Sequence, residues 1–129
     1  EFVDFEPATC NPRPVNGSIP VLVGGDTAAA IDRAVRIADG YFPGEGDIGR
    51  LGELISRLRR KAEQAQRDPD SIEINAMFGV QMADPAAGIE QMAELGVGRI
   101  MIPAFFFAGP DGMDRLSEFG EKMIPLTKE

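Results

Sequence analysis

The stretch Pro20-Val21-Leu22-Val23-Gly24-Gly25-Asp26-Thr27 decides how we expect this chain to fold. Its apolar run is short and rich in valine, it stops at two glycines, and an alanine-rich segment with helical spacing follows it. A continuous apolar strand of this length is typical of a parallel sheet that is covered on both faces. The stretch therefore predicts a strand, a tight turn and a helix that Asp26 or Thr27 can cap.

The same pattern recurs three more times toward the C-terminus. Tyr41-Phe42-Pro43 is a second, very short strand, and Asp47 can cap the long amphipathic helix after it. Residues 72–80 alternate as a third strand, with Glu73 and Asn75 on its polar side, and residues 100–102 form a fourth. Short apolar strands that alternate with amphipathic helices predict an α/β fold with four parallel strands joined by right-handed crossovers.

Two further helix starts and one helix end can be read from the chain. Asp84-Pro85 joins a capping carboxylate to a proline at the first helical position, and Asp111 can cap a last helix in the same way. Gly96 follows the Asp84 helix and can end it in the left-handed conformation. The six methionines are interpreted as fillers of the core.

The length allows one small domain. Residues 1–19 are interrupted by prolines and by Asn16-Gly17, which predicts an irregular loop or a short hairpin. Residues 20–129 hold the four strand-helix units. A closed (β/α)8 barrel takes typically ~250 residues, so four units amount to half a barrel.

The composition excludes several kinds of function. The 129 residues contain no histidine and one cysteine, Cys10, which rules out a His general base, a Ser-His-Asp triad, a thiolate zinc site and an internal disulfide within this chain. A net charge of -8 argues against nucleic acid. We find no apolar run of the ~20 residues that a membrane span needs and no signal peptide, and we expect a cytoplasmic protein.

Residues 20–27 and the later run Ala34-Val35-Arg36-Ile37-Ala38-Asp39-Gly40-Tyr41-Phe42-Pro43 resemble the luciferase-like monooxygenase family. Its members are enzymes on a TIM barrel that depend on flavin or on the deazaflavin coenzyme F420. Residues 67–74 and 95–100 look like the C-terminal units of the family, and residues 5–7 and 12–15 look like the loop before its fifth strand. The resemblance covers nearly the whole chain.

The resemblance implies that the chain is the C-terminal half of such an enzyme, with strands five to eight. It implies a fragment of an F420- or FMN-dependent oxidoreductase or monooxygenase that acts on a small organic substrate. The catalytic residues are expected in the absent N-terminal half, so the chain alone should be inactive. Members of the family that are acidic and rich in arginine and alanine, as this chain is, often come from actinobacteria, where F420 is common, so the resemblance favours F420 over FMN.

The turn at Gly24, Gly25 and Thr27 is the first candidate site, because it lies between a strand end and a helix N-terminus, where free N–H groups can bind a phosphate. The resemblance assigns these residues to the phosphate or ribityl tail of the cofactor. The alternative is a tight turn with a capped helix. Asp26 would repel a phosphate, so we expect it to cap the helix and face away.

Two aromatic residues complete the predicted site. Phe42 can line the cofactor mouth, with burial in the core as the alternative. Phe105, in the run Phe105-Phe106-Phe107, can pack on a flavin ring or a substrate, with packing against the missing half or a partner subunit as the alternative. Asp39 lies at the N-terminal end of its strand, where a barrel keeps structural residues, and is expected to bond a turn.

A second function from another class fits the same pattern. Four parallel units leave unpaired outer strands and an uncovered face, and such edges invite pairing with another copy. The alternative is therefore a self-associating half-barrel scaffold without activity of its own, and in either case we expect a homo-oligomer. A third reading, an unrelated phosphate-binding α/β domain, stays open until the reading frame before Glu1 is known.

Overall fold

The computed structural model describes residues 6 and 11–127, and these residues form one parallel sheet with helices between its strands. The strands lie in the order of the chain: β1 (Leu22–Gly24), β2 (Gly40–Phe42), β3 (Glu73–Met77) and β4 (Arg99–Met101). The helices are α1 (Ala28–Ile37), α2 (Ile48–Gln64), α3 (Pro85–Glu94) and α4 (Gly112–Met123). The prediction of four parallel strands that alternate with helices is confirmed.

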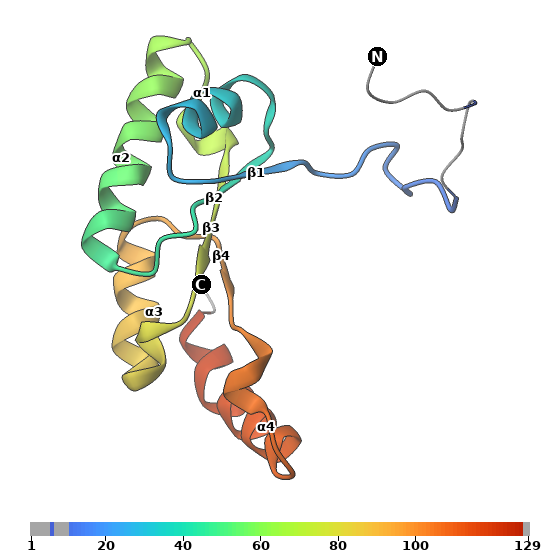
Figure 1. Ribbon diagram of the computed structural model, residues 1–129, viewed down its shortest axis with the longest axis vertical. Coiled ribbons are helices and arrows are strands. Elements are labelled where there is room, and N and C mark those ends of the chain that lie inside the picture. Colours follow the sequence, from blue (N-terminus) through green and yellow to red (C-terminus); the bar gives the residue numbers. More distant parts are fainter. Residues whose placement is uncertain (1–5, 7–10, 128–129) are drawn as a thin grey trace.

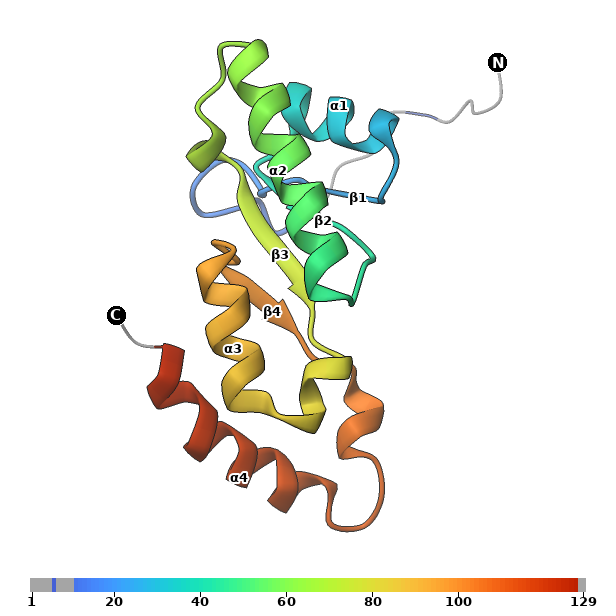
Figure 2. The ribbon, with the colours of Figure 1, turned by 90° about the vertical axis from the view of Figure 1, so that its left-hand side faces the viewer.

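Helices α1, α2 and α3 cover one face of the sheet, as Figures 1 and 2 show from two sides. The core lies between that face and the helices. From the strands it takes Val23, Tyr41, Ile74 and Ala76, and from the helices mainly Ile31, Leu51, Ile55, Leu58 and Met92. The opposite face, here called the inner face, carries the alternate strand residues, which are Leu22, Gly24, Gly40, Phe42, Glu73, Asn75, Met77, Arg99 and Met101. No helix of the described residues packs on the inner face (Figure 1).

Local capping accounts for most of the helix boundaries. Thr27 Oγ1 accepts a hydrogen bond from Ala30 N at 3.2 Å, Asp47 Oδ1 accepts one from Arg50 N at 2.9 Å, and Asp84 Oδ1 accepts one from Ala87 N at 3.3 Å. Gly96 has a φ of 78°, as a glycine that ends a helix should. These predicted starts and this end are confirmed.

Other local predictions are wrong. The third strand ends at Met77 rather than at residue 80, because Val80–Ala83 turns into a 3-10 helix, η2. Asp111 precedes α4, but its side chain caps no backbone N–H. Met113 on α4 is 73% exposed, so it fills no core in the described part of the chain. The Phe-rich loop also contains a 3-10 helix, η3, at Ala104–Phe107.

Two side chains fasten the end of the sheet where the strands begin. Asp39 Oδ2 accepts a hydrogen bond from Val21 N at 2.7 Å, in agreement with its predicted structural role. Arg67 follows α2 and donates from Nη1 to Val35 O at 3.0 Å and from Nη2 to Ala38 O at 2.6 Å. Its guanidinium therefore satisfies carbonyls at the C-terminus of α1, which have no partner within that helix.

We predict that Arg67→Leu lowers the free energy of unfolding by about 2 kcal/mol, because it removes charge-assisted hydrogen bonds to the end of α1. Arg33→Leu, at an exposed position of the same helix, should change it by less than about 0.5 kcal/mol. Urea unfolding followed by circular dichroism measures both. Equal changes in the two variants would show that Arg67 does not hold α1.

Candidate functional site

All four βα turns meet along one edge of the sheet, because the strands are parallel and lie in sequential order. We call this edge the C-terminal edge. Along it lie, in order, the turn at Gly24–Thr27, the turn at Phe42–Gly44, η2 and η3. In α/β folds ligands bind outside the carboxyl ends of the strands. The C-terminal edge is therefore the part of this chain in which we look for a site.

Two glycines leave little room for a side chain where the β1 turn passes β2 and the start of α1. Gly25 has a φ of 111°, and its N–H donates to Phe42 O at 3.2 Å. A Cβ on Gly24 would lie 3.3 Å from the same Phe42 oxygen, and a Cβ on Gly25 would lie 3.3 Å from Ala30 Cβ. The structure thus brings together Gly24, Gly25, Thr27 and Phe42 of the predicted site.

The buried Tyr41 side chain holds this turn from below. Its hydroxyl donates to Gly25 O at 2.8 Å. Burial, and to a lesser extent the charge of Asp26, raise the pKa of Tyr41 to about 12, while the charge of Arg57 opposes them. Tyr41 is therefore a neutral donor at physiological pH. The sequence pattern predicts Tyr41 only as a strand residue, and no local signal points to this bond.

Asp26 does not cap α1, so that part of the prediction is wrong. Its Oδ1 accepts a hydrogen bond from Gly44 N at 2.8 Å, across the gap between the β1 and β2 turns. Thr27 occupies the capping position instead. The Gly44 amide thus holds the carboxylate toward the neighbouring β2 turn.

Gln81 extends this bonding to the third strand. The side chain is buried, its Nε2 donates to Gly46 O at 2.8 Å, and its Oε1 accepts from Gly79 N at 3.2 Å. Gly88 on α3 makes the room, since a Cβ there would lie 2.5 Å from Gln81 Cβ. No local sequence signal points to Gln81, because its partners lie on other elements.

Asn75 lies on the inner face, in register with Arg99 of β4. The sequence predicts a polar face for it, yet the residue is buried, with 1% of its surface exposed. Its Nδ2 donates weakly to Glu73 O at 3.4 Å and sits above Gly40, whose Cβ would lie 3.2 Å away. Its Oδ1 has no hydrogen-bond partner among the described residues.

Phe105 is not brought to the rest of the predicted site. It lies in η3 after β4, at the opposite end of the sheet from the β1 turn, and it is 70% exposed. Its ring lies 4.6 Å from that of Phe106, while Phe107 contacts Phe119 of α4 edge to face. Phe105 and Phe106 thus lie against each other, and Phe107 packs on α4.

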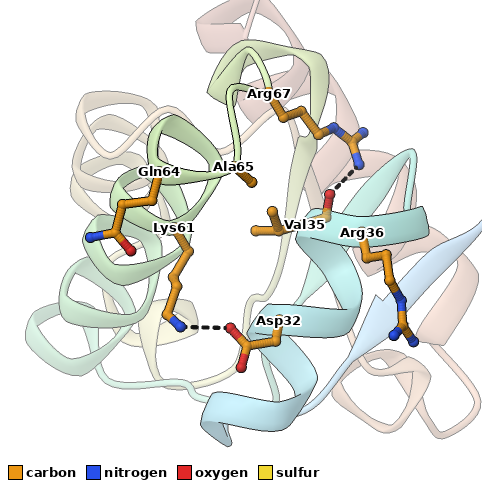
Figure 3. A pocket seen from close by; sticks show the side chains of 7 residues that line it. All are labelled: Asp32, Val35, Arg36, Lys61, Gln64, Ala65 and Arg67. Atoms are coloured by element: carbon orange, nitrogen blue, oxygen red, sulfur yellow. Dashed lines mark hydrogen bonds and ion pairs between the residues drawn. The ribbon is translucent and has the colours of Figure 1, made fainter.

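A groove of about 600 Å³ lies between α1 and α2 (Figure 3). It is on the helix-covered side of the sheet, and three of its four charged side chains, those of Asp32, Lys61 and Arg67, already bond within the chain. Lys61 pairs with Asp32 at 2.9 Å, and Arg67 bonds Val35 O. We therefore place the candidate site at the C-terminal edge and not in this groove.

The part of the chain that the structure describes has neither a metal-binding cluster nor a membrane-spanning helix. Among residues 6 and 11–127, no three acidic, histidine or cysteine side chains converge to hold a metal ion. Within the same residues, no helix is long and apolar enough to cross a lipid bilayer.

Comparison with known proteins identifies the class. The family model of luciferase-like monooxygenases matches residues 1–120, and this chain belongs to that family. Uncharacterized proteins of Mycobacterium tuberculosis and Mycobacterium bovis are 34% identical to it over 103 residues. Each match covers 79% of this chain and 34% of the relative, so the chain spans about a third of those proteins.

The fold has a counterpart among solved structures. The coenzyme F420 dependent tetrahydromethanopterin reductase from Methanopyrus kandleri superposes with a TM-score of 0.70 at 16% identity. The superposition covers 98% of this chain and 56% of the reductase chain. At this identity the likeness establishes the fold, which is a part of a TIM-barrel-like luciferase fold.

We predict that the pKa of Tyr41 can be read directly, because it is the one tyrosine of a chain without tryptophan. Tyrosinate absorbance of the folded chain should appear near pH 12, against 10 for an exposed tyrosine. Because the folded pKa is the higher one, the neutral form stabilises the fold below pH 10, and that contribution is lost as the pH rises toward 12.

Tyr41→Phe should lower the free energy of unfolding by about 1 kcal/mol at neutral pH and abolish this loss above pH 10. Urea unfolding of both proteins, measured from pH 8 upward in steps of about one pH unit, gives the comparison. A wild-type tyrosinate transition near pH 10 would contradict the buried bond to Gly25.

We predict opposite effects for the two buried amides. Asn75→Leu should leave the free energy of unfolding unchanged or raise it by about 1 kcal/mol, because it removes an acceptor that lacks a partner. Gln81→Leu should lower it by about 2 kcal/mol, because Gly46 O and Gly79 N lose their partner. Thermal unfolding checks both, and a loss in Asn75→Leu equal to that in Gln81→Leu would mean that Asn75 Oδ1 is bonded.

Proposed function

We propose that this chain is the C-terminal half of a luciferase-like oxidoreductase or monooxygenase that depends on F420 or FMN, and that it supplies the loop for the cofactor phosphate. One observation carries the proposal: the exposed Gly24–Thr27 turn is held rigid by hydrogen bonds at the C-terminal edge, directly before the N-terminus of α1. The family membership supports a cofactor of this type.

The start of α1 has the groups that a phosphate needs. The first N–H groups of a helix have no partner within it, and the helix dipole favours a negative charge there. Thr27 Oγ1 accepts from Ala30 N, which leaves its own proton free to donate to a phosphate oxygen. The Gly44 amide holds the Asp26 carboxylate toward the β2 turn, which limits its repulsion.

The remaining parts of the function follow from the family. When bound, the cofactor carries out the hydride or oxygen chemistry, and the chain positions it. Phe42 lines the mouth beside Gly24, and Phe105 offers an exposed ring farther along the edge. The F420-dependent reductase with the same fold supports F420 over FMN. The substrate is a small organic molecule, the catalytic residues come from outside this chain, and the enzyme works in the cytoplasm.

A second candidate is the self-associating half-barrel scaffold. The unpaired outer sides of β1 and β4 and the bare inner face favour it. Such a module would need no cofactor, so the binding experiment that follows separates the two functions.

The phosphate loop predicts that the chain prefers FMN to riboflavin, which lacks the phosphate. Thr27→Val should weaken FMN binding roughly tenfold, since it removes a hydrogen bond to a charged group, and should leave riboflavin binding unchanged. Thr27→Ser keeps the hydroxyl and should bind FMN as the wild type does. Quenching of flavin fluorescence measures all three, and F420 is titrated in parallel through its own fluorescence.

Two results would contradict the proposal. Equal affinity for FMN and riboflavin would show that the turn does not bind phosphate. Tight binding by this chain alone would show that half of the pocket is not missing. Circular dichroism of each variant shows whether the loss of the Thr27 cap has unfolded α1.

A further inference from the structure

Positive charge is concentrated on the two helices α1 and α2, although the chain as a whole is acidic. These helices carry seven of the 13 arginines and lysines but three of the 21 aspartates and glutamates. The rest of the chain is therefore strongly negative, and the two helices form a local region of the opposite sign. Such a region attracts an oppositely charged partner to one face of a molecule.

A second groove, of about 360 Å³, adjoins the groove of Figure 3 along the same pair of helices. Lys61 and Gln64 line both, so we treat the two as one feature and call them the paired grooves. Among the described residues, Asp32 is the one carboxylate that lines them. Five cationic side chains line them, namely those of Arg36, Arg57, Arg60, Lys61 and Arg67.

Three of these cations have no ionic partner in the part of the chain that the structure describes. Arg36, Arg57 and Arg60 make no ion pair there. Glu53 lies four residues before Arg57, the spacing at which ion pairs form along a helix, yet the two side chains do not pair. Figure 3 shows Arg36 without a bond to any residue drawn beside it. In a chain with an excess of carboxylates, three guanidinium groups thus remain available to a partner.

The carboxylates near the paired grooves are oriented toward other groups. Asp32 pairs with Lys61 at 2.9 Å, and an exposed ion pair of this kind stabilises little. Asp26 and Asp39, just before and just after α1, each accept a hydrogen bond from a backbone N–H. The glutamates of α2 and the aspartates of the turn after it line neither groove. The lining of the paired grooves therefore keeps a net positive charge.

We propose that the paired grooves bind an acidic segment of a partner protein in an extended conformation. The grooves follow α1 from Ala28 to Arg36, a rise of about 12 Å along a helix. An extended peptide covers this length with about four residues. A guanidinium group binds a carboxylate through two parallel hydrogen bonds, and arginine is enriched in protein interfaces. The segment should therefore be a short run rich in aspartate or glutamate.

Two features favour a protein segment over a nucleic acid. None of the described residues that line the paired grooves is aromatic, so a base would find no ring on which to stack. The acidic remainder of the chain would also repel a long polyanion. The walls are partly apolar, which suits the side chains of a peptide; the apolar lining residues are Ala28, Ile31, Val35 and Ala65.

The paired grooves lie on the helix-covered side of the sheet, opposite the inner face. The absent half of a barrel would extend the sheet beyond β1 and β4, so it would not cover the surface between α1 and α2. The acidic segment and the cofactor therefore occupy different parts of the molecule. The proposal rests on the charge and shape of the paired grooves and not on the cofactor.

The experiment titrates a fluorescein-labelled hexaglutamate peptide with the chain, without cofactor, and follows fluorescence anisotropy. The wild-type chain should bind, and a rise from about 20 to about 200 mM salt should weaken binding roughly tenfold, because exposed ion pairs are screened. Arg57→Glu and Arg60→Glu should each weaken binding roughly tenfold. Arg33→Glu makes the same change of charge on α1 at an exposed position that lines neither groove, and it should bind as the wild type does. Circular dichroism shows whether each variant is folded.

Two competitors test the shape and the class of the partner. Citrate carries its carboxylates on one compact molecule and should compete roughly tenfold more weakly than unlabelled hexaglutamate. An oligothymidylate of the same length should also compete more weakly. Equal competition by citrate would replace the extended segment by a small anion, and tighter binding of the oligothymidylate would replace it by a nucleic acid. Either result would overturn the proposal, and so would no binding by the wild type or an equal loss in Arg33→Glu.

Discussion

The sequential order of four parallel strands is the constraint on which the rest of this structure depends. Each crossover returns to the same end of the sheet, so α1, α2 and α3 gather on one face and all βα turns gather on one edge. The helix-covered face holds the apolar core, and the inner face keeps Asn75, Glu73 and Arg99. The location of the candidate site and the bare inner face are two consequences of one topology.

Hydrogen bonds between neighbouring turns make the C-terminal edge a connected unit. Tyr41 and Asp26 tie the β1 turn to the β2 turn, and Gln81 ties the β2 loop to η2. The positive φ of Gly25 is maintained from both sides, by its own N–H to Phe42 O and by the Tyr41 hydroxyl. A phosphate loop benefits from such rigidity, because its N–H groups are aligned before the ligand arrives.

The sequence predicted what is encoded locally. The valine-rich run before Gly24-Gly25, the Asp84-Pro85 start and Gly96 each specify their element through their own backbone preferences, and the family could be recognised from runs of this kind. The missed features depend on residues far apart in the chain. The direction of Asp26 is set by Gly44, the burial of Asn75 by its place over Gly40, and the exposure of Met113 by the absence of a neighbour among the described residues.

The central claim is that the turn between β1 and α1 receives the phosphate of a flavin-type cofactor. The most direct measurement is an amide chemical-shift map of the 15N-labelled chain, titrated with FMN and then with riboflavin. We expect FMN, and not riboflavin, to move the resonances of Gly25, Ala28 and Ala29. Identical shifts with both ligands, or shifts confined to the groove between α1 and α2, would contradict it.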